Sequence, residues 1–195
     1  MEEKLYKAAE FGRVEEAKEL LRNNPTLNVN WKNENQYDFC ALYQASIGGH
    51  DPAILAAIMA HPDVDVNLKY KGGWTPFMSA SYYGHVSCFC LLLKDSRVEV
   101  NEPDSDGYTP LRNAASKGRL DVVKWWIASG REIDLGTPGV DCSDAIGAAT
   151  KKKKKDMVSL LERFKESPEE TRHGVRNELK IIGQSAFILP LYFSV

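Results

Sequence analysis

The sequence predicts an all-α repeat array, and two observations point to this fold class. Residues 74–85 read WTPFMSASYYGH and return in residues 108–119 as YTPLRNAASKGR. The glycines of these phrases, Gly84 and Gly118, lie 34 positions apart, and a period near this length is typical of stacked helical units. After the second phrase, residues 122–127 carry apolar side chains at the i, i+3, i+4 spacing of an amphipathic helix. One such unit cannot bury both of its helices, so we expect neighbouring units to supply the core.

Each unit is expected to begin its first helix at a capping residue. The hydroxyls of Thr75 and Thr109 can accept a hydrogen bond from an unpaired helical amide, and the prolines that follow lack the amide that would otherwise stay unpaired. In the last unit, Ser143 takes the capping place and Lys152 takes the place of the glycine. The glycines of the other units are expected to end the first helix in a conformation that disfavours a Cβ; they are Gly12, Gly49, Gly84 and Gly118.

With these motifs the chain resembles the ankyrin repeat family over roughly residues 3–164. The resemblance rests on the Thr-Pro starts at residues 75–76 and 109–110, on the small pairs such as residues 114–115, and on the glycine that follows. It implies an ankyrin repeat solenoid of about five helix-loop-helix units with β-hairpin-like fingers, degenerate terminal units, a concave face that binds partners, and no catalytic residues.

We expect two parts, an array over residues 1–164 and a tail over residues 165–195 that packs on the array or extends it. A helix is expected over residues 167–182, docked on the open end of the stack. Residues 185–195 are abruptly apolar, and three interpretations stay open for them: a segment folded on the last repeat, a dimerisation surface through which the chain oligomerises, or a shallow membrane contact. Pro190 and the short length argue against a spanning helix.

Composition and charge narrow the classes of function. The 195 residues are 43% hydrophobic and 27% charged, as in ordinary globular proteins. Residues 1–150 carry 15 Lys and Arg against 21 Asp and Glu, a net charge of −6, which argues against nucleic acid as the main partner. The four cysteines share no zinc spacing and are expected as buried thiols, so we expect no metal and no cofactor. The polar start and the lack of an 18-residue apolar run predict no secretory signal and no transmembrane segment; we expect a cytoplasmic protein, with the nucleus as the alternative.

The candidate site follows from the resemblance, in which the finger tips and the exposed side of the first helix face the partner. The position before each Thr-Pro start holds Phe39, Trp74 and Tyr108, with Tyr82 and Tyr83 behind them. Clustered exposed aromatics are enriched at binding hot spots. The predicted partner-binding residues are Phe39, Lys69, Lys71, Trp74, Tyr82, Tyr83, Asp106, Tyr108 and Lys117. The alternative is that the rings pack on neighbouring fingers and hold the hairpins together.

We therefore expect a non-catalytic protein–protein interaction module or adaptor that binds a protein partner on its concave face. The alternative is a regulator or effector whose C-terminal tail carries a localisation or assembly activity. Five consecutive lysines, residues 151–155, are either a nuclear-import or phosphate-binding run or a solvated helix end. An enzyme is not expected, because the sequence pairs no nucleophile with a base at a meaningful spacing.

Overall fold

The computed structural model describes residues 1–137 and 143–180. These two ranges contain eleven α-helices, and the β-pairing within them is limited to one isolated bridge between Asn33 and Phe39. The helices are α1 (Glu2–Glu10), α2 (Val14–Asn23), α3 (Ala41–Ile47), α4 (Pro52–Met59), α5 (Pro76–Tyr83), α6 (Val86–Lys94), α7 (Pro110–Lys117), α8 (Leu120–Ser129), α9 (Ala145–Lys151), α10 (Lys155–Glu166) and α11 (Pro168–Glu178).

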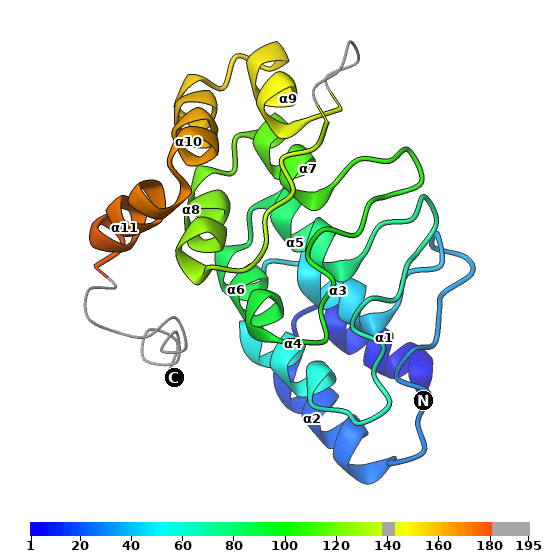
Figure 1. Ribbon diagram of the computed structural model, residues 1–195. Coiled ribbons are helices and arrows are strands. Elements are labelled where there is room, and N and C mark those ends of the chain that lie inside the picture. Colours follow the sequence, from blue (N-terminus) through cyan, green and yellow to red (C-terminus); the bar gives the residue numbers. More distant parts are fainter. Residues whose placement is uncertain (138–142, 181–195) are drawn as a thin grey trace.

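The first ten helices form five consecutive pairs that stack along the chain (Figure 1). The first helices of the pairs, α1, α3, α5, α7 and α9, make one layer in which each contacts the next, and the second helices α2, α4, α6 and α8 make another. The predicted all-α solenoid of helix-loop-helix units is confirmed.

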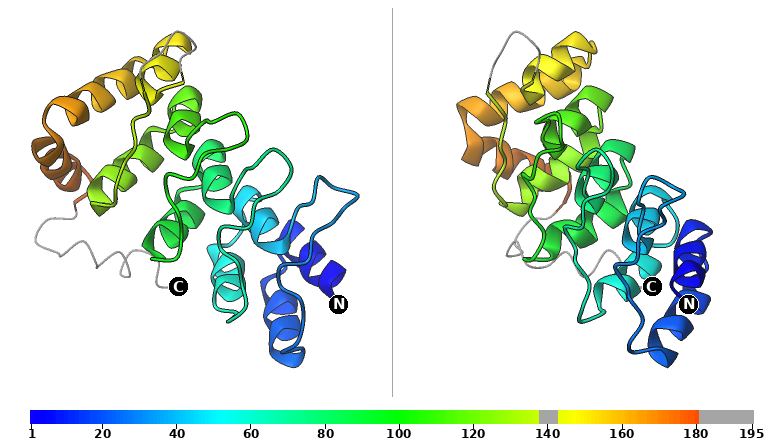
Figure 2. Two further views of the ribbon diagram at one scale, coloured as in Figure 1. Left: turned by 45° about the vertical axis from the view of Figure 1, so that its right-hand side comes forward. Right: turned by 90° about the vertical axis from the view of Figure 1, so that its right-hand side faces the viewer.

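The connections between units form the β-hairpin-like fingers, which project on the same side of the stack in both views of Figure 2. Each finger is closed by a backbone hydrogen bond; the donors and acceptors are Asn33 to Phe39 (2.9 Å), Tyr70 to Trp74 (3.1 Å) and Asp104 to Tyr108 (3.0 Å). Successive fingers are also joined, from the amide of Lys71 to the carbonyl of Tyr37 and from that of Ser105 to Gly72. These bonds hold the fingers side by side.

The predicted caps are present in the two phrases that contain Thr-Pro. The hydroxyl of Thr75 accepts from the Met78 amide at 3.2 Å, and that of Thr109 accepts from the Arg112 amide at 3.3 Å. Helices α5 and α7 then begin at proline and end at glycines in the left-handed conformation.

In the fifth pair the prediction was wrong by one residue. Asp144, not Ser143, caps α9, because its carboxylate accepts from the Gly147 amide at 2.8 Å. The left-handed residue that ends the pattern is correspondingly Lys153, with φ 57°, and not Lys152. The cap and the left-handed residue are nine positions apart in this pair, as they are in the third and fourth pairs. The one-residue shift of the cap therefore shifts the left-handed residue by one position as well.

The glycine of each unit leaves room for a side chain of the next unit. His85 donates from Nε2 to the carbonyl of Ile47 at 2.9 Å, and a Cβ at Gly49 would lie 2.5 Å from its ring. Arg119 donates in the same way to Tyr82 at 2.8 Å. In the third and fourth units, the residue that follows the glycine therefore anchors its unit on the unit before.

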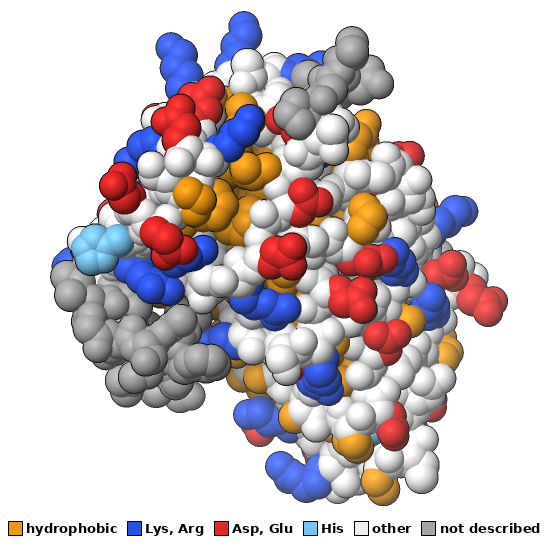
Figure 3. Space-filling model, viewed as in Figure 1, with side chains coloured by type: hydrophobic (Ala, Val, Ile, Leu, Met, Phe, Trp, Pro, Cys, Tyr) orange, Lys and Arg blue, Asp and Glu red, His pale blue; other side chains and the backbone are white. Residues whose placement is uncertain are grey.

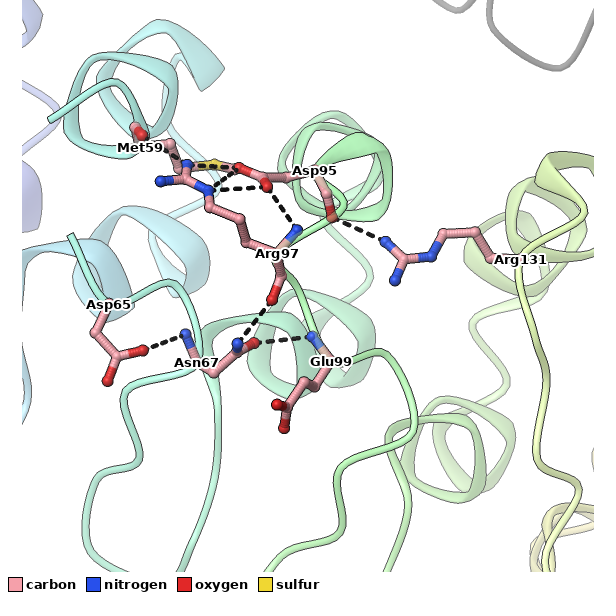
Figure 4. A network of polar contacts seen from close by, with 7 residues as sticks. All are labelled: Met59, Asp65, Asn67, Asp95, Arg97, Glu99 and Arg131. Carbon is pink, nitrogen blue, oxygen red and sulfur yellow. Dashed lines mark hydrogen bonds and ion pairs between the residues drawn. The ribbon is translucent and has the colours of Figure 1, made fainter. Parts of the chain in front are cut away.

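A second set of contacts lies at the end of the second helices (Figure 4). The side chain of Asn67 donates to the Arg97 carbonyl at 2.8 Å and accepts from the Glu99 amide at 2.9 Å. Asn30 makes the same pair of bonds to the following unit. Arg97 pairs with Asp95 at 2.7 Å and lowers the pKa of that carboxyl.

The core runs through all units, and its largest side chain is Trp126 in α8, which is fully buried. Its ring lies 5.0 Å from that of Phe77 and 5.8 Å from that of Phe89, both in the preceding unit. Burial raises the pKa of Cys88 to about 11 and that of Cys90 to about 12, so both thiols stay protonated in the core.

Helix α11 packs against both α8 and α10. Val175 is buried in this contact, while Arg172 and Arg176 donate to the carbonyls of Ile127 and Ala128 at the end of α8. The helix ends at Glu178, earlier than the predicted residue 182. Residues 185–195 lie outside the described residues, and the division of the chain at residue 164 stays a prediction.

The contact across Gly49 makes a testable prediction. Gly49→Ala should cost about 1 kcal/mol more in unfolding free energy than Gly107→Ala, measured by urea denaturation. Both glycines have positive φ, so both substitutions strain the backbone. Only Gly49→Ala also displaces His85 from Ile47, because nothing lies within 4 Å of a Cβ at Gly107. Equal losses would contradict the anchoring role of His85.

The asparagine contact makes a second prediction. Asn67→Ala should lower the unfolding free energy by about 1–2 kcal/mol, because two hydrogen bonds to the next unit are lost together. The matched control is Asn177→Ala on the exposed face of α11, which should change stability by less than about 0.5 kcal/mol. Thermal and urea melts of both variants check this, and a neutral Asn67→Ala would show that these bonds add nothing.

Candidate functional site

Aromatic rings follow one another from the first finger across the second finger to the end of α5. Successive ring centroids lie 4.2 Å apart for Phe39 and Tyr43, 4.1 Å for Tyr43 and Tyr70, 6.3 Å for Tyr70 and Trp74, 5.0 Å for Trp74 and Tyr82, and 5.2 Å for Tyr82 and Tyr83. Tyr37 extends the series at 5.6 Å from Phe39. We call these seven residues the aromatic row.

The base of the row is Tyr43 and Tyr70. Tyr43 is only 4% exposed, and burial raises the pKa of both phenols. Sequence reasoning missed Tyr70. The sequence feature that could have identified Tyr70 is its position in the finger. The equivalent residues of the other two fingers are Asn33 and Asp104, whose side chains accept hydrogen bonds from backbone amides within the turn. A tyrosine at that polar position brings a ring to the base of the row.

The rim of the row is open. Tyr37 is 68% exposed and Tyr83 is 42% exposed, while Phe39, Trp74 and Tyr82 are half-buried. The same rings thus pack against neighbouring fingers and present apolar surface. Rigid rings fixed from below and exposed above are suited to contact with another protein.

Tyr108 is separate from the row. The Arg112 guanidinium lies over its ring, 3.7 Å from the ring centroid. Among the described residues, the Tyr108 ring contacts no other aromatic ring. Phe39 and Trp74 are therefore joined through Tyr70, whereas the third predicted finger residue lies in a cation–π pair.

The predicted charged residues lie around the row. Lys69 forms an ion pair with Glu102 of the next finger. Lys71 and Asp106 are exposed near the finger tips. Lys117, at the end of α7, places its ammonium 4.5 Å from the centroid of the Tyr82 ring.

The described residues hold no group of three or more His, Cys, Asp or Glu side chains arranged to bind a metal ion. The three cysteines of this part of the chain, Cys40, Cys88 and Cys90, are buried and unbonded. A cavity of about 610 Å³ lies between α1 and the first finger and is lined by side chains of both charges. Over residues 1–137 and 143–180, none of the helices is both long and apolar enough to cross a membrane.

Comparison with known proteins agrees with this geometry. Residues 42–137 match the family model described as ankyrin repeats, in three copies. The chain is 29% identical over 115 residues to the SMC5-SMC6 complex localization factor protein 1 of Bos taurus, covering 58% of this chain and 11% of that protein.

Two further relatives match over a longer and a shorter stretch. Alpha-latrocrustotoxin-Lt1a of Latrodectus tredecimguttatus is 30% identical over 126 residues, which are 64% of this chain and 9% of the toxin. Ankyrin repeat and SAM domain-containing protein 3 of Homo sapiens is 42% identical over 59 residues, which are 30% of this chain and 8% of that protein. The chain spans about a tenth of the length of these relatives. From its stacked helix pairs, its fingers and the match to the repeat model, the chain belongs to the ankyrin repeat family.

Proposed function

We propose that this chain is a non-catalytic adaptor that binds a protein partner on its concave face, with the aromatic row at the centre of the contact. Ankyrin repeats indicate a protein–protein interaction module. The observation that carries the proposal is the continuity of the row, in which rings from two fingers, α3 and α5 form one partly exposed surface.

The energetics favour the rim as the main contact. Tyr43 and Tyr70 fix the rings from beneath, so binding immobilises few side chains and loses little conformational entropy. A central aromatic residue at such an interface contributes about 2 kcal/mol or more. Trp74 carries the largest ring of the row, and Tyr83, at the end of the row, is exposed.

The charged neighbours would form the polar rim of this interface. Lys69 and Lys71 flank the row on the second finger, Asp106 lies on the third, and the Lys117 ammonium lies over the Tyr82 ring. Tyr108 would contribute through its pair with Arg112. Charges at a rim govern the rate and specificity of association more than its affinity.

The name of one relative, a localization factor of the SMC5-SMC6 complex, supports an adaptor role for this chain. We place the protein in the cytoplasm, with the nucleus as the alternative, because the buried thiols Cys40, Cys88 and Cys90 are unbonded, as in a reducing compartment. The other relatives carry different names, so the partner does not transfer from them.

Capture of partners from native lysate tests the proposal. The double variant Trp74→Ala, Tyr83→Ala should lose at least about tenfold in captured partner, because two rings of the row that reach the surface are removed. The measurement is quantitative mass spectrometry after affinity capture, with circular dichroism to show that the helices remain.

The matched control is Phe11→Ala, which removes an aromatic side chain that is 58% exposed at the end of α1, outside the row. It should leave capture unchanged. Retained capture by a folded double variant would overturn the assignment of the row.

Removal of residues 181–195 tests the alternative function. The deletion leaves every described helix in place, since α11 ends at Glu178. If the adaptor proposal is right, the shortened chain captures the same partners in the same amount. Unchanged capture combined with a lost cellular location or assembly state, seen by microscopy and light scattering, would favour a regulator or effector that acts through its tail.

A further inference from the structure

Six lysines gather at the end of the stack next to the aromatic row. We call them the basic ridge: Lys117, Lys151, Lys152, Lys153, Lys154 and Lys155. All six are exposed. Lys117 ends α7, the other five join α9 to α10, and α7 and α9 are in direct contact. Figure 3 shows Lys and Arg side chains at the top of the molecule, where α9 and α10 lie in Figure 1.

The two parts of the ridge meet at Gly118. The stem of Lys154 lies over this glycine, and a Cβ there would come within 2.9 Å of the lysine Cδ. Lys117 is the residue before it. Lysines of two successive units therefore form one continuous positive surface.

The ridge has no counter-charge in the described part of the chain. Eight ion pairs are formed there, and none includes a ridge lysine. Asp156 and Glu162 line hollows of about 430 and 410 Å³ beside Lys153, Lys154 and Lys155, yet neither carboxylate comes within ion-pair distance of them. Like charges gathered without partners repel one another.

The fold does not require this charge. Lys153 occupies the left-handed position that glycine occupies in the third and fourth units, at φ 57°. A lysine there costs about 1–2 kcal/mol relative to glycine. Arg97 and Arg131, by contrast, donate to backbone carbonyls of the preceding unit and hold the stack together. The lysines of the ridge make no such bond in the described structure.

The ridge continues the proposed binding surface. The Lys117 ammonium lies 4.5 Å from the centroid of the Tyr82 ring, and Tyr82 contacts both Trp74 and Tyr83. A chain that covers the exposed rings and runs toward the end of the stack must cross these lysines.

Resting on the proposed function, we propose that the occupant is an acidic segment of the protein partner, in which carboxylates beside an apolar anchor lie along the basic ridge while the anchor packs on the aromatic row. Carboxylates would supply the counter-charge that the described residues lack. The length of the ridge favours a short protein segment over nucleic acid, because a long polyanion would extend over residues 1–150, whose net charge is −6.

The test uses two fourfold variants of the full chain that remove equal charge. The ridge variant carries Lys117→Gln, Lys151→Gln, Lys152→Gln and Lys155→Gln. The control variant carries Lys4→Gln, Lys94→Gln, Lys165→Gln and Lys180→Gln, at lysines that are also exposed. The probe is a fluorescein-labelled peptide of glutamates around two central leucines, followed by anisotropy at low salt.

The ridge variant should bind this peptide about tenfold more weakly than the native chain, because four favourable charge contacts are lost. The control variant should bind as the native chain does. An equal loss in both variants, or no binding by the native chain, would overturn the inference. Tighter binding of a short DNA duplex, or of phosphatidylserine–phosphatidylcholine vesicles in equal parts, would overturn it in favour of a phosphate-bearing partner.

Comparing lysate capture by the ridge variant and by the double aromatic variant separates this inference from the proposed function. If Trp74→Ala, Tyr83→Ala abolishes capture of lysate partners while the ridge variant captures them fully, the adaptor role stands and the acidic segment is refuted. If the ridge variant loses the peptide while the double aromatic variant still captures partners, the ridge stands and the role of the aromatic row is refuted.

Discussion

The contact between each unit and the unit before it is the interaction on which the structure depends. His85 reaches over Gly49 to the carbonyl of Ile47, and Arg119 reaches over Gly84 to that of Tyr82. These bonds join the ends of the first helices, while asparagines such as Asn67 join the loops that follow the second helices. No unit could bury its helices without such neighbours, and the direction of every finger follows from this stacking.

The aromatic row is a consequence of the same regularity. Because the fingers are bonded side by side, a ring in one finger meets a ring in the next; Phe39 and Tyr70, 31 positions apart, have centroids separated by 5.0 Å. The row is rigid at its base, since Tyr43 is buried, and open at its rim, where Tyr83 is exposed. The stacking of repeats thereby brings single aromatic residues of successive units together into one continuous surface.

The last unit departs from the others in a way that concentrates charge. The glycine that ends α5 and α7 is replaced by Lys153 within a run of lysines, although the rest of the array is acidic. Beyond it, α11 packs against α8 and α10, and its arginines donate to carbonyls at the end of α8. The end of the stack is closed on the side of the second helices and strongly positive on the side of the turns.

The order of the helices, the caps at Thr75 and Thr109 and the left-handed glycines follow from the sequence alone, because they depend on residues within one or two turns of each other. Phe39 and Trp74 could also be placed on the fingers from their frame position. Only the tertiary structure decided that Tyr70 links them, that Tyr108 lies apart under Arg112, that Lys117 lies over Tyr82, and that Asp144 sets the register of the last pair. The contacts of Tyr70 with Phe39 and of Lys117 with Tyr82 join different units, and local periodicity carries no information about which side chains meet across about 34 residues. The Tyr108–Arg112 pair and the Asp144 cap join residues within one helical turn, where the repeat pattern allows more than one partner.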